Sequence, residues 1–314
     1  MRWKGRRQSD NVEVRRRSGG LFGRRSRPSG PTIRLPRGGR TGGVRRAGGS
    51  SIILIILVVL GLWIFAGINP MQLMDMLARQ QGGTVVTDVS APQRSPAQQA
   101  ADQELQQFMA VVLAETEDTW GRIFRQNGAQ YEPTKLVIYD QATPTECGFG
   151  QAATGPFYCP ADRNVYIDLT FFDLLSQRLG APGDFAQAYV LAHEVGHHVQ
   201  KLTGVLDRYH QNRQRMSEAE ANRESVKVEL QADCYAGVWA HDADRIGILD
   251  DGDIDEALNA AAQVGDDVIQ RRTQGRVVPE SFNHGTAEQR ARWFRAGYRS
   301  GNPSDCDTFS ARTL

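Results

Sequence analysis

An HExxH motif, His193-Glu194-Val195-Gly196-His197, most constrains the fold of this chain, because it must lie on a helix for both histidines to face one metal ion. Residues four apart share a helix face. The motif therefore predicts that His193 and His197 bind zinc through one imidazole nitrogen each. Glu194 is expected to act on a water at the metal as a general base, without being a ligand. The alternative is a pair of surface histidines on an ordinary helix.

Two acidic residues further along the chain could complete such a zinc site. A catalytic zinc usually has three protein ligands and one open position, so one ligand remains to be found. Glu229 and Asp233 are again four residues apart, in a largely apolar segment where carboxylates need partners. We expect Glu229 to be the third ligand of one zinc ion per chain, and Asp233 to accept a hydrogen bond from a ligating histidine. The alternative is a solvated acidic helix edge.

His284 is a further candidate, in Phe282-Asn283-His284-Gly285-Thr286 on a loop before the last helix. Hydrolysis of an amide builds negative charge on the carbonyl oxygen, and a positioned hydrogen-bond donor stabilises that charge. His284 is a candidate catalytic residue in this role. A structural role at the start of the helix is equally compatible with the sequence.

The charge of the chain is unevenly distributed. Residues 1–50 hold 15 Lys and Arg against two acids, whereas the whole chain has 37 basic and 36 acidic residues. This basic segment is rich in Gly, Ser and Pro, and its composition predicts a disordered tail. It lacks the interleaved aromatic residues that stack on bases, so we expect no nucleic-acid partner. Its charges would allow contact with anionic lipid headgroups.

An uncharged apolar run over residues 51–68 is long enough to cross a bilayer core. It predicts a single transmembrane helix; a cleaved signal peptide is the alternative, but the run is long for one. Positive charge flanks only its N-terminal end, which places residues 1–50 in the cytoplasm and the rest outside it. Residues 69–101 then form a polar, Pro-bearing stalk, and residues 102–314 a globular domain.

All four cysteines follow the apolar run, and an even number in an oxidising compartment indicates two disulfides. Three pairings are possible. We favour Cys147–Cys159, which closes a short Gly-rich loop, and Cys234–Cys306, which ties the C-terminal end to a helix near the metal.

Hydrophobic periodicity predicts an α+β fold, in which one helix precedes a few strands and several helices follow. The expected helices cover residues 104–125, 171–179, 184–202, 217–239 and 253–269, and the expected strands cover 136–139 and 165–169.

Taken together, the motifs resemble a known family, the bacterial membrane-anchored neutral zinc metallopeptidases of the YpfJ-like type. The similarity extends over nearly the whole chain. The segments that carry it are Met1–Glu13, Cys147–Gly148, Gly155–Pro160, Val165–Asp168, Ala192–Gln200, Glu229–Gly237 and His284–Thr286.

The resemblance implies a zincin-like, more narrowly gluzincin-like, domain with His193, His197 and Glu229 as ligands. It also implies that the strand over residues 164–169 binds an extended peptide. The expected function is a zinc endopeptidase acting on peptide or protein substrates, anchored in the bacterial inner membrane with its domain in the periplasm. The alternatives are a non-catalytic zinc-stabilised scaffold of the envelope and a zinc amidase acting on cell-wall peptides.

Overall fold

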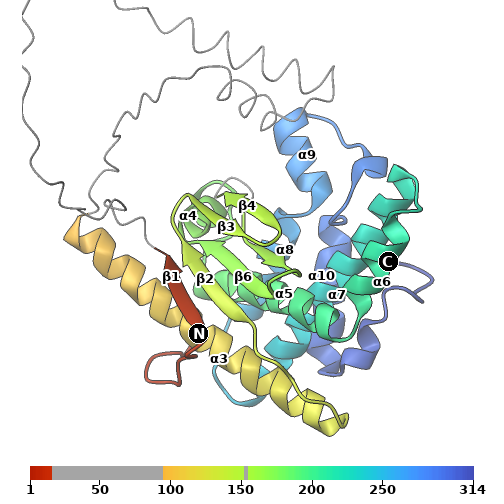
Figure 1. Cartoon of the computed structure of the whole chain (residues 1–314). Coiled ribbons are helices and arrows are strands. Elements are labelled where there is room, and N and C mark those ends of the chain that lie inside the picture. Colours follow the sequence, from red (N-terminus) through yellow and green to blue (C-terminus); the bar gives the residue numbers. More distant parts are fainter. Residues whose placement is uncertain (16–94, 152–154) are drawn as a thin grey trace, which may run out of the picture. The chain divides into compact units, whose positions relative to one another are not determined.

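Helices, a four-stranded sheet and a two-stranded hairpin form the part of the chain that the computed structural model describes, residues 1–15, 95–151 and 155–314 (Figure 1). This mixed architecture agrees with the predicted α+β class. The helices are α3 (Pro96–Gln126), α4 (Thr170–Gln177), α5 (Asp184–Leu202), α6 (Val205–Arg213), α7 (Glu218–Arg245), α8 (Asp253–Gln263), α9 (Asp266–Gln274) and α10 (Ala287–Ser300). The strands are β1 (Val12–Arg15), β2 (Lys135–Tyr139), β3 (Ala142–Thr145), β4 (Gly148–Gln151), β5 (Phe157–Cys159) and β6 (Asn164–Asp168).

The main sheet has the strand order β1-β2-β6-β5. Its first three strands are parallel, and β5 runs antiparallel to β6. The two predicted strands are confirmed as β2 and β6, with bounds that differ by one residue. They are the central strands, whose side chains are almost all buried. Strands β3 and β4 form a separate hairpin.

The first fifteen residues pack against the domain, so the predicted disordered tail is wrong for this part. Strand β1 pairs with β2 in register from Val12–Leu136 to Arg15–Tyr139. The nearby basic side chains find acidic partners on α3, as in the 2.7 Å ion pair between Arg6 and Glu115. Composition did not reveal this because a strand can join a sheet through its main chain, without burying many large apolar side chains.

The membrane and stalk predictions fall mostly outside the described residues. The apolar run 51–68 is among the residues that are not described. In the described part, no helix is long and apolar enough to cross a membrane. Helix α3 begins at Pro96, inside the segment predicted as a stalk, with Ser95 and Gln98 forming a capping box. Its first turns are exposed and carry no apolar periodicity, and for this reason the sequence predicts a later start, at residue 104.

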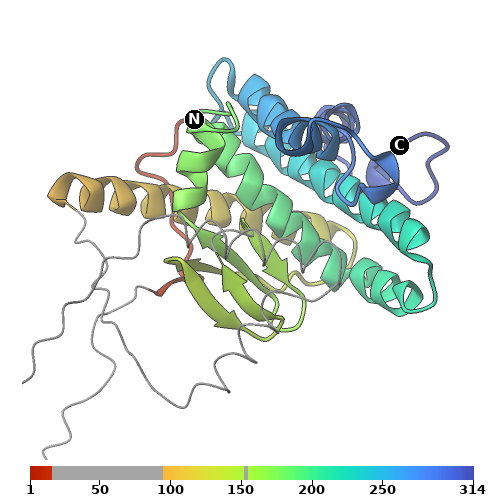
Figure 2. The ribbon, with the colours of Figure 1, turned by 90° about the horizontal axis from the view of Figure 1, so that it is seen from above.

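Helix α5 carries the HExxH motif and lies between the sheet and α7 (Figure 2). Its predicted range, 184–202, is confirmed. A Cβ atom on Gly196 would lie 2.9 Å from the carbonyl oxygen of Ala232 on α7. Such a distance is shorter than a normal contact, so the glycine lets the two helices approach closely. The motif helix and the helix of Glu229 and Asp233 are thereby brought together.

One long predicted helix is wrong. The range 253–269 is divided into α8 and α9, which meet at Gly265. This glycine has an extended backbone, with φ −66° and ψ 140°. A Cβ atom there would collide with the backbone of Ala287 at the start of α10. The break therefore allows α9 to contact the loop that carries His284.

The structure contains both favoured disulfides. Cys147–Cys159 joins the turn between β3 and β4 to β5, and Cys234–Cys306 joins α7 to the C-terminal segment. The sequence separations are 12 and 72 residues. In the chain-entropy account, closing loops of these lengths stabilises a fold by about 3 to 4 kcal/mol each.

Candidate metal centre

Three side chains from two helices converge on one point. His193 and His197 project from α5 and Glu229 from α7. Nε2 of His193 lies 3.2 Å from Oε2 of Glu229, and Nε2 of His197 lies 3.5 Å from Oε1. One ligand atom from each residue lies within 4.8 Å of the other two. Tetrahedral zinc with bonds of about 2.0–2.1 Å requires ligand atoms about 3.3 Å apart, so these three residues fit the ion.

The orientation of His193 is fixed from behind by Asp233. The two are joined by a 2.8 Å hydrogen bond, which the Nδ1–H of His193 donates to Oδ1 of Asp233 because an ionised carboxylate only accepts. Nε2 faces Glu229 and is the nitrogen left for a metal ion. Asp233 thus lies where the sequence predicts it, as the hydrogen-bond partner of a candidate histidine ligand.

Two residues that were not predicted from the sequence form hydrogen bonds with Asp233. Arg290 of α10 donates to both carboxylate oxygens, at 2.8 Å from Nε and 3.0 Å from Nη2. The hydroxyl of Tyr189 donates to Oδ1 at 2.6 Å. Tyr189 lies four residues before His193, a spacing that could have revealed it. Arg290 is 57 residues from Asp233 and no local pattern marks it.

Charge in this cluster is balanced by pairs of buried groups. Burial raises the pKa of Asp233, but the charges of Arg290 and His193 outweigh it and lower the pKa to about 2. Burial lowers the pKa of His193, but Asp233 and Glu229 raise it overall to about 10. The carboxylates therefore favour a cation among the ring nitrogens. A metal ion entering there would displace a proton from His193.

Glu194 is placed as the sequence predicted, next to His193 on α5 and on the wall of the same groove. Its side chain is buried, and burial raises its pKa although the neighbouring histidines oppose the shift. A general base works best when its pKa is near the working pH. The raised pKa suits this carboxylate to accept a proton and release it again.

The converging side chains lie on the wall of an open groove of about 520 Å³. The segment around β5 and helix α6 also line it. The lining residues from the first are 155–158 and Pro160, and those from α6 are Leu206, Tyr209, His210 and Arg213. An open groove leaves room for a substrate at the position where a fourth ligand would bind.

The strand beside the groove is not the one expected from the resemblance. Strand β6, over Asn164–Asp168, has β2 on one side and β5 on the other. Its main chain is therefore already paired over Asn164–Tyr166 in both directions. Strand β5 lies at the edge of the sheet and lines the groove. The prediction that the 164–169 strand binds peptide is therefore wrong for Asn164–Tyr166, because only an edge strand can pair with a further chain.

His284 lies on the groove wall, on the loop that precedes α10. The carboxylate of Asp266 organises this loop by accepting the backbone N–H groups of Asn283, His284 and Gly285 at 2.7–3.0 Å. It also lies 3.2 Å from Nδ1 of His284. Burial lowers the pKa of this half-exposed histidine, but Asp266 and Glu229 raise it overall. Protonation, which the raised pKa favours, would give the ring a second N–H donor besides the one facing Asp266.

Comparisons with known proteins agree with this geometry. A family model described as "Putative neutral zinc metallopeptidase" matches residues 1–309. "Uncharacterized protein YpfJ" of Escherichia coli (strain K12) is 49% identical over 311 residues, which cover 98% of this chain and 99% of that protein. "Uncharacterized protein Rv2575" of Mycobacterium tuberculosis (strain ATCC 25618 / H37Rv) is 47% identical over 195 residues, 59% of this chain and 65% of the relative. No solved structure matches.

Proposed function

The chain belongs to the "Putative neutral zinc metallopeptidase" family, and from this premise we propose that it is a zinc-dependent endopeptidase. His193, His197 and Glu229 would hold one zinc ion. The observation that carries the proposal is the spacing of their ligand atoms on the wall of an open groove. A structural zinc site would be closed by a fourth protein ligand, whereas a catalytic site keeps one position open. The pairing of an HExxH helix with a glutamate from α7 supports a gluzincin-like arrangement.

When bound by His193, His197 and Glu229, zinc would supply Lewis-acid chemistry, polarising the substrate carbonyl and lowering the pKa of water. Glu194 takes the proton of the attacking water and delivers it to the leaving amine. Its raised pKa supports both transfers, because the carboxylate must both accept and lose a proton near neutral pH. Asp233 holds His193 in the tautomer that leaves Nε2 free, and Arg290 keeps Asp233 ionised.

The position of β5 supports an extended peptide as the substrate. Edge strands bind peptides through main-chain hydrogen bonds, and pockets beside them select side chains. The Cys147–Cys159 disulfide anchors the end of β5. Both disulfides also support an oxidising compartment as the place of action, because such bonds rarely persist in a reducing cytosol.

We expect the substitution His284→Ala to lower kcat by about 10²–10³-fold, the loss typical of one donor to a developing oxyanion. Zinc content should not change, because His284 is not one of the three converging ligands. Kinetics with a peptide substrate would measure the effect. His210→Ala is the matched control, since it removes another histidine that lines the same groove. An equal loss in both variants would count against a specific role of His284 as the donor.

The proposed function is tested by metal removal. We expect the full chain to cleave an unfolded protein, to lose this activity on chelation, and to regain it when zinc is added. Mass spectrometry of the products would identify the bonds. Cleavage of peptidoglycan fragments alone would favour the cell-wall amidase. If the chain binds zinc, cleaves neither substrate and unfolds on chelation, the scaffold alternative replaces the proposal.

A further inference from the structure

Gln200, one helical turn after His197 on α5, is a buried amide with no part in the proposed reaction. Its side chain is 0% exposed. Its Oε1 lies 2.9 Å from Nδ1 of His197. Its Nε2 lies 2.7 Å from the carbonyl oxygen of Val228 and 3.0 Å from Oε1 of Gln231, both on α7. All the polar atoms of this amide are therefore engaged, and one of them contacts a proposed zinc ligand.

The direction of these hydrogen bonds follows from two backbone carbonyls, which can only accept. Gln231 donates from Nε2 to the carbonyl of Cys306 at 3.0 Å, so its Oε1 faces Gln200. Gln200 must then donate both N–H groups, one to Gln231 and one to the carbonyl of Val228. Its Oε1 is left for His197, whose Nδ1 must carry the proton. Nε2 of His197, which faces Glu229, is then the nitrogen left for a metal ion.

We infer that Gln200 is a positioning residue of the zinc site, which fixes the tautomer and ring orientation of His197. This inference rests on the proposed function and deepens it. His193 is held in the same way by a charged partner, because its Nδ1 forms a hydrogen bond with Asp233. The site is therefore asymmetric, with one histidine held by a carboxylate and the other by a neutral amide.

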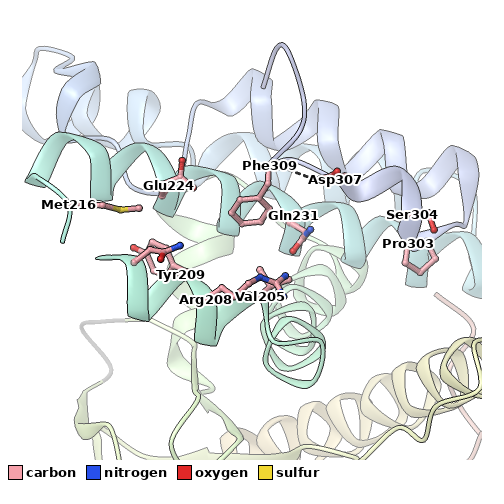
Figure 3. A pocket seen from close by; sticks show the side chains of 11 residues that line it. Val205, Arg208, Tyr209, Met216, Glu224, Gln231, Pro303, Ser304, Asp307 and Phe309 are labelled. Atoms are coloured by element: carbon pink, nitrogen blue, oxygen red, sulfur yellow. Dashed lines mark hydrogen bonds between the residues drawn. The ribbon is translucent and has the colours of Figure 1, made fainter. Parts of the chain in front are cut away.

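The hydrogen-bond series ends at the Cys234–Cys306 disulfide. Gln231 is 5% exposed and projects from α7 into a hollow of about 360 Å³ between α7, α6 and the C-terminal segment (Figure 3). The disulfide keeps the carbonyl of Cys306 in place at the end of the series. The C-terminal segment thereby supports the orientation of His197 from a distance, through Gln231 and Gln200.

The test is the zinc dissociation constant of the full-length protein, measured by competition with a chromophoric chelator. Gln200→Met preserves the approximate shape of the side chain and removes the acceptor. We expect it to weaken zinc binding by about 10–100-fold, as for other residues that hydrogen-bond to metal ligands. Gln200→Glu restores an acceptor for Nδ1–H, and we expect it to bind zinc more tightly than Gln200→Met. A packing role would not be rescued in this way.

Gln231→Met is the matched control, because it removes the same amide from a similarly buried position but leaves the bond between Gln200 and His197. We expect a smaller loss of zinc affinity. Equal losses at the two positions, unchanged affinity in Gln200→Met, or no rescue by Glu would each overturn the inference. If Gln200→Met fails to fold, the zinc affinities of the wild type, Gln200→Glu and Gln231→Met decide instead. A lower zinc affinity in Gln200→Glu than in Gln231→Met would then count against the inference. Absence of zinc from the wild type would instead refute the proposed function.

Discussion

Glu194→Gln is expected to abolish peptide hydrolysis while zinc remains bound. The amide has almost the shape of the carboxylate but cannot accept a proton from water. General-base catalysis by a positioned side chain contributes about 10²–10⁴-fold, so kcat should fall by at least that range. Glu194 is not among the converging ligand atoms, and the metal content should therefore stay near that of the wild type.

Steady-state kinetics and elemental analysis of the same preparations would measure both effects. Glu218→Gln is the matched control, because Glu218 is an exposed glutamate in the first turn of α7. It should retain wild-type kinetics. Retained hydrolysis in Glu194→Gln would refute the proposed mechanism, and loss of zinc together with activity would make Glu194 a ligand instead.

Glu229→Ala is expected to remove most of the bound zinc. The substitution deletes the only carboxylate among the three converging ligands and leaves two histidine nitrogens. It also removes a negative charge that raises the pKa of both histidines, so protons compete less with the metal in the variant. The loss of a ligand should nevertheless dominate, exceeding the roughly 10–100-fold weakening typical of an outer hydrogen-bond partner.

Zinc content after dialysis would test this expectation, with about one ion per wild-type chain. Glu224→Ala is the matched control, because Glu224 lies on the same helix but forms an ion pair with Lys227. It should keep its zinc. A full complement of zinc in Glu229→Ala would remove Glu229 from the ligand set.

The sequence predicts the candidate zinc ligands and Asp233 better than the residues that hold them in place. His193 and His197, and likewise Glu229 and Asp233, are linked by spacing within single helices, which a local pattern reveals. Arg290 and Gln231 reach their partners only because α10 and the C-terminal segment pack against α7. Such contacts depend on how helices approach one another, and no local pattern encodes them.

The fold shows the same division. The central strands β2 and β6 were predicted because their side chains are apolar and buried, whereas the short strands β1 and β5 pair mainly through their main chains. Helix α5 was predicted over its full length because its apolar positions continue from end to end. The prediction of one helix over 253–269 was wrong because the break at Gly265 depends on its contact with Ala287.

The pairing of β1 with β2 limits how the chain can be arranged around a lipid bilayer. Two strands exchange main-chain hydrogen bonds only when no membrane separates them, so Val12–Arg15 and Lys135–Tyr139 must lie on one side. The prediction that residues 1–50 and 102–314 lie on opposite sides of a membrane therefore does not hold for Val12–Arg15. The first fifteen residues share the compartment of the groove.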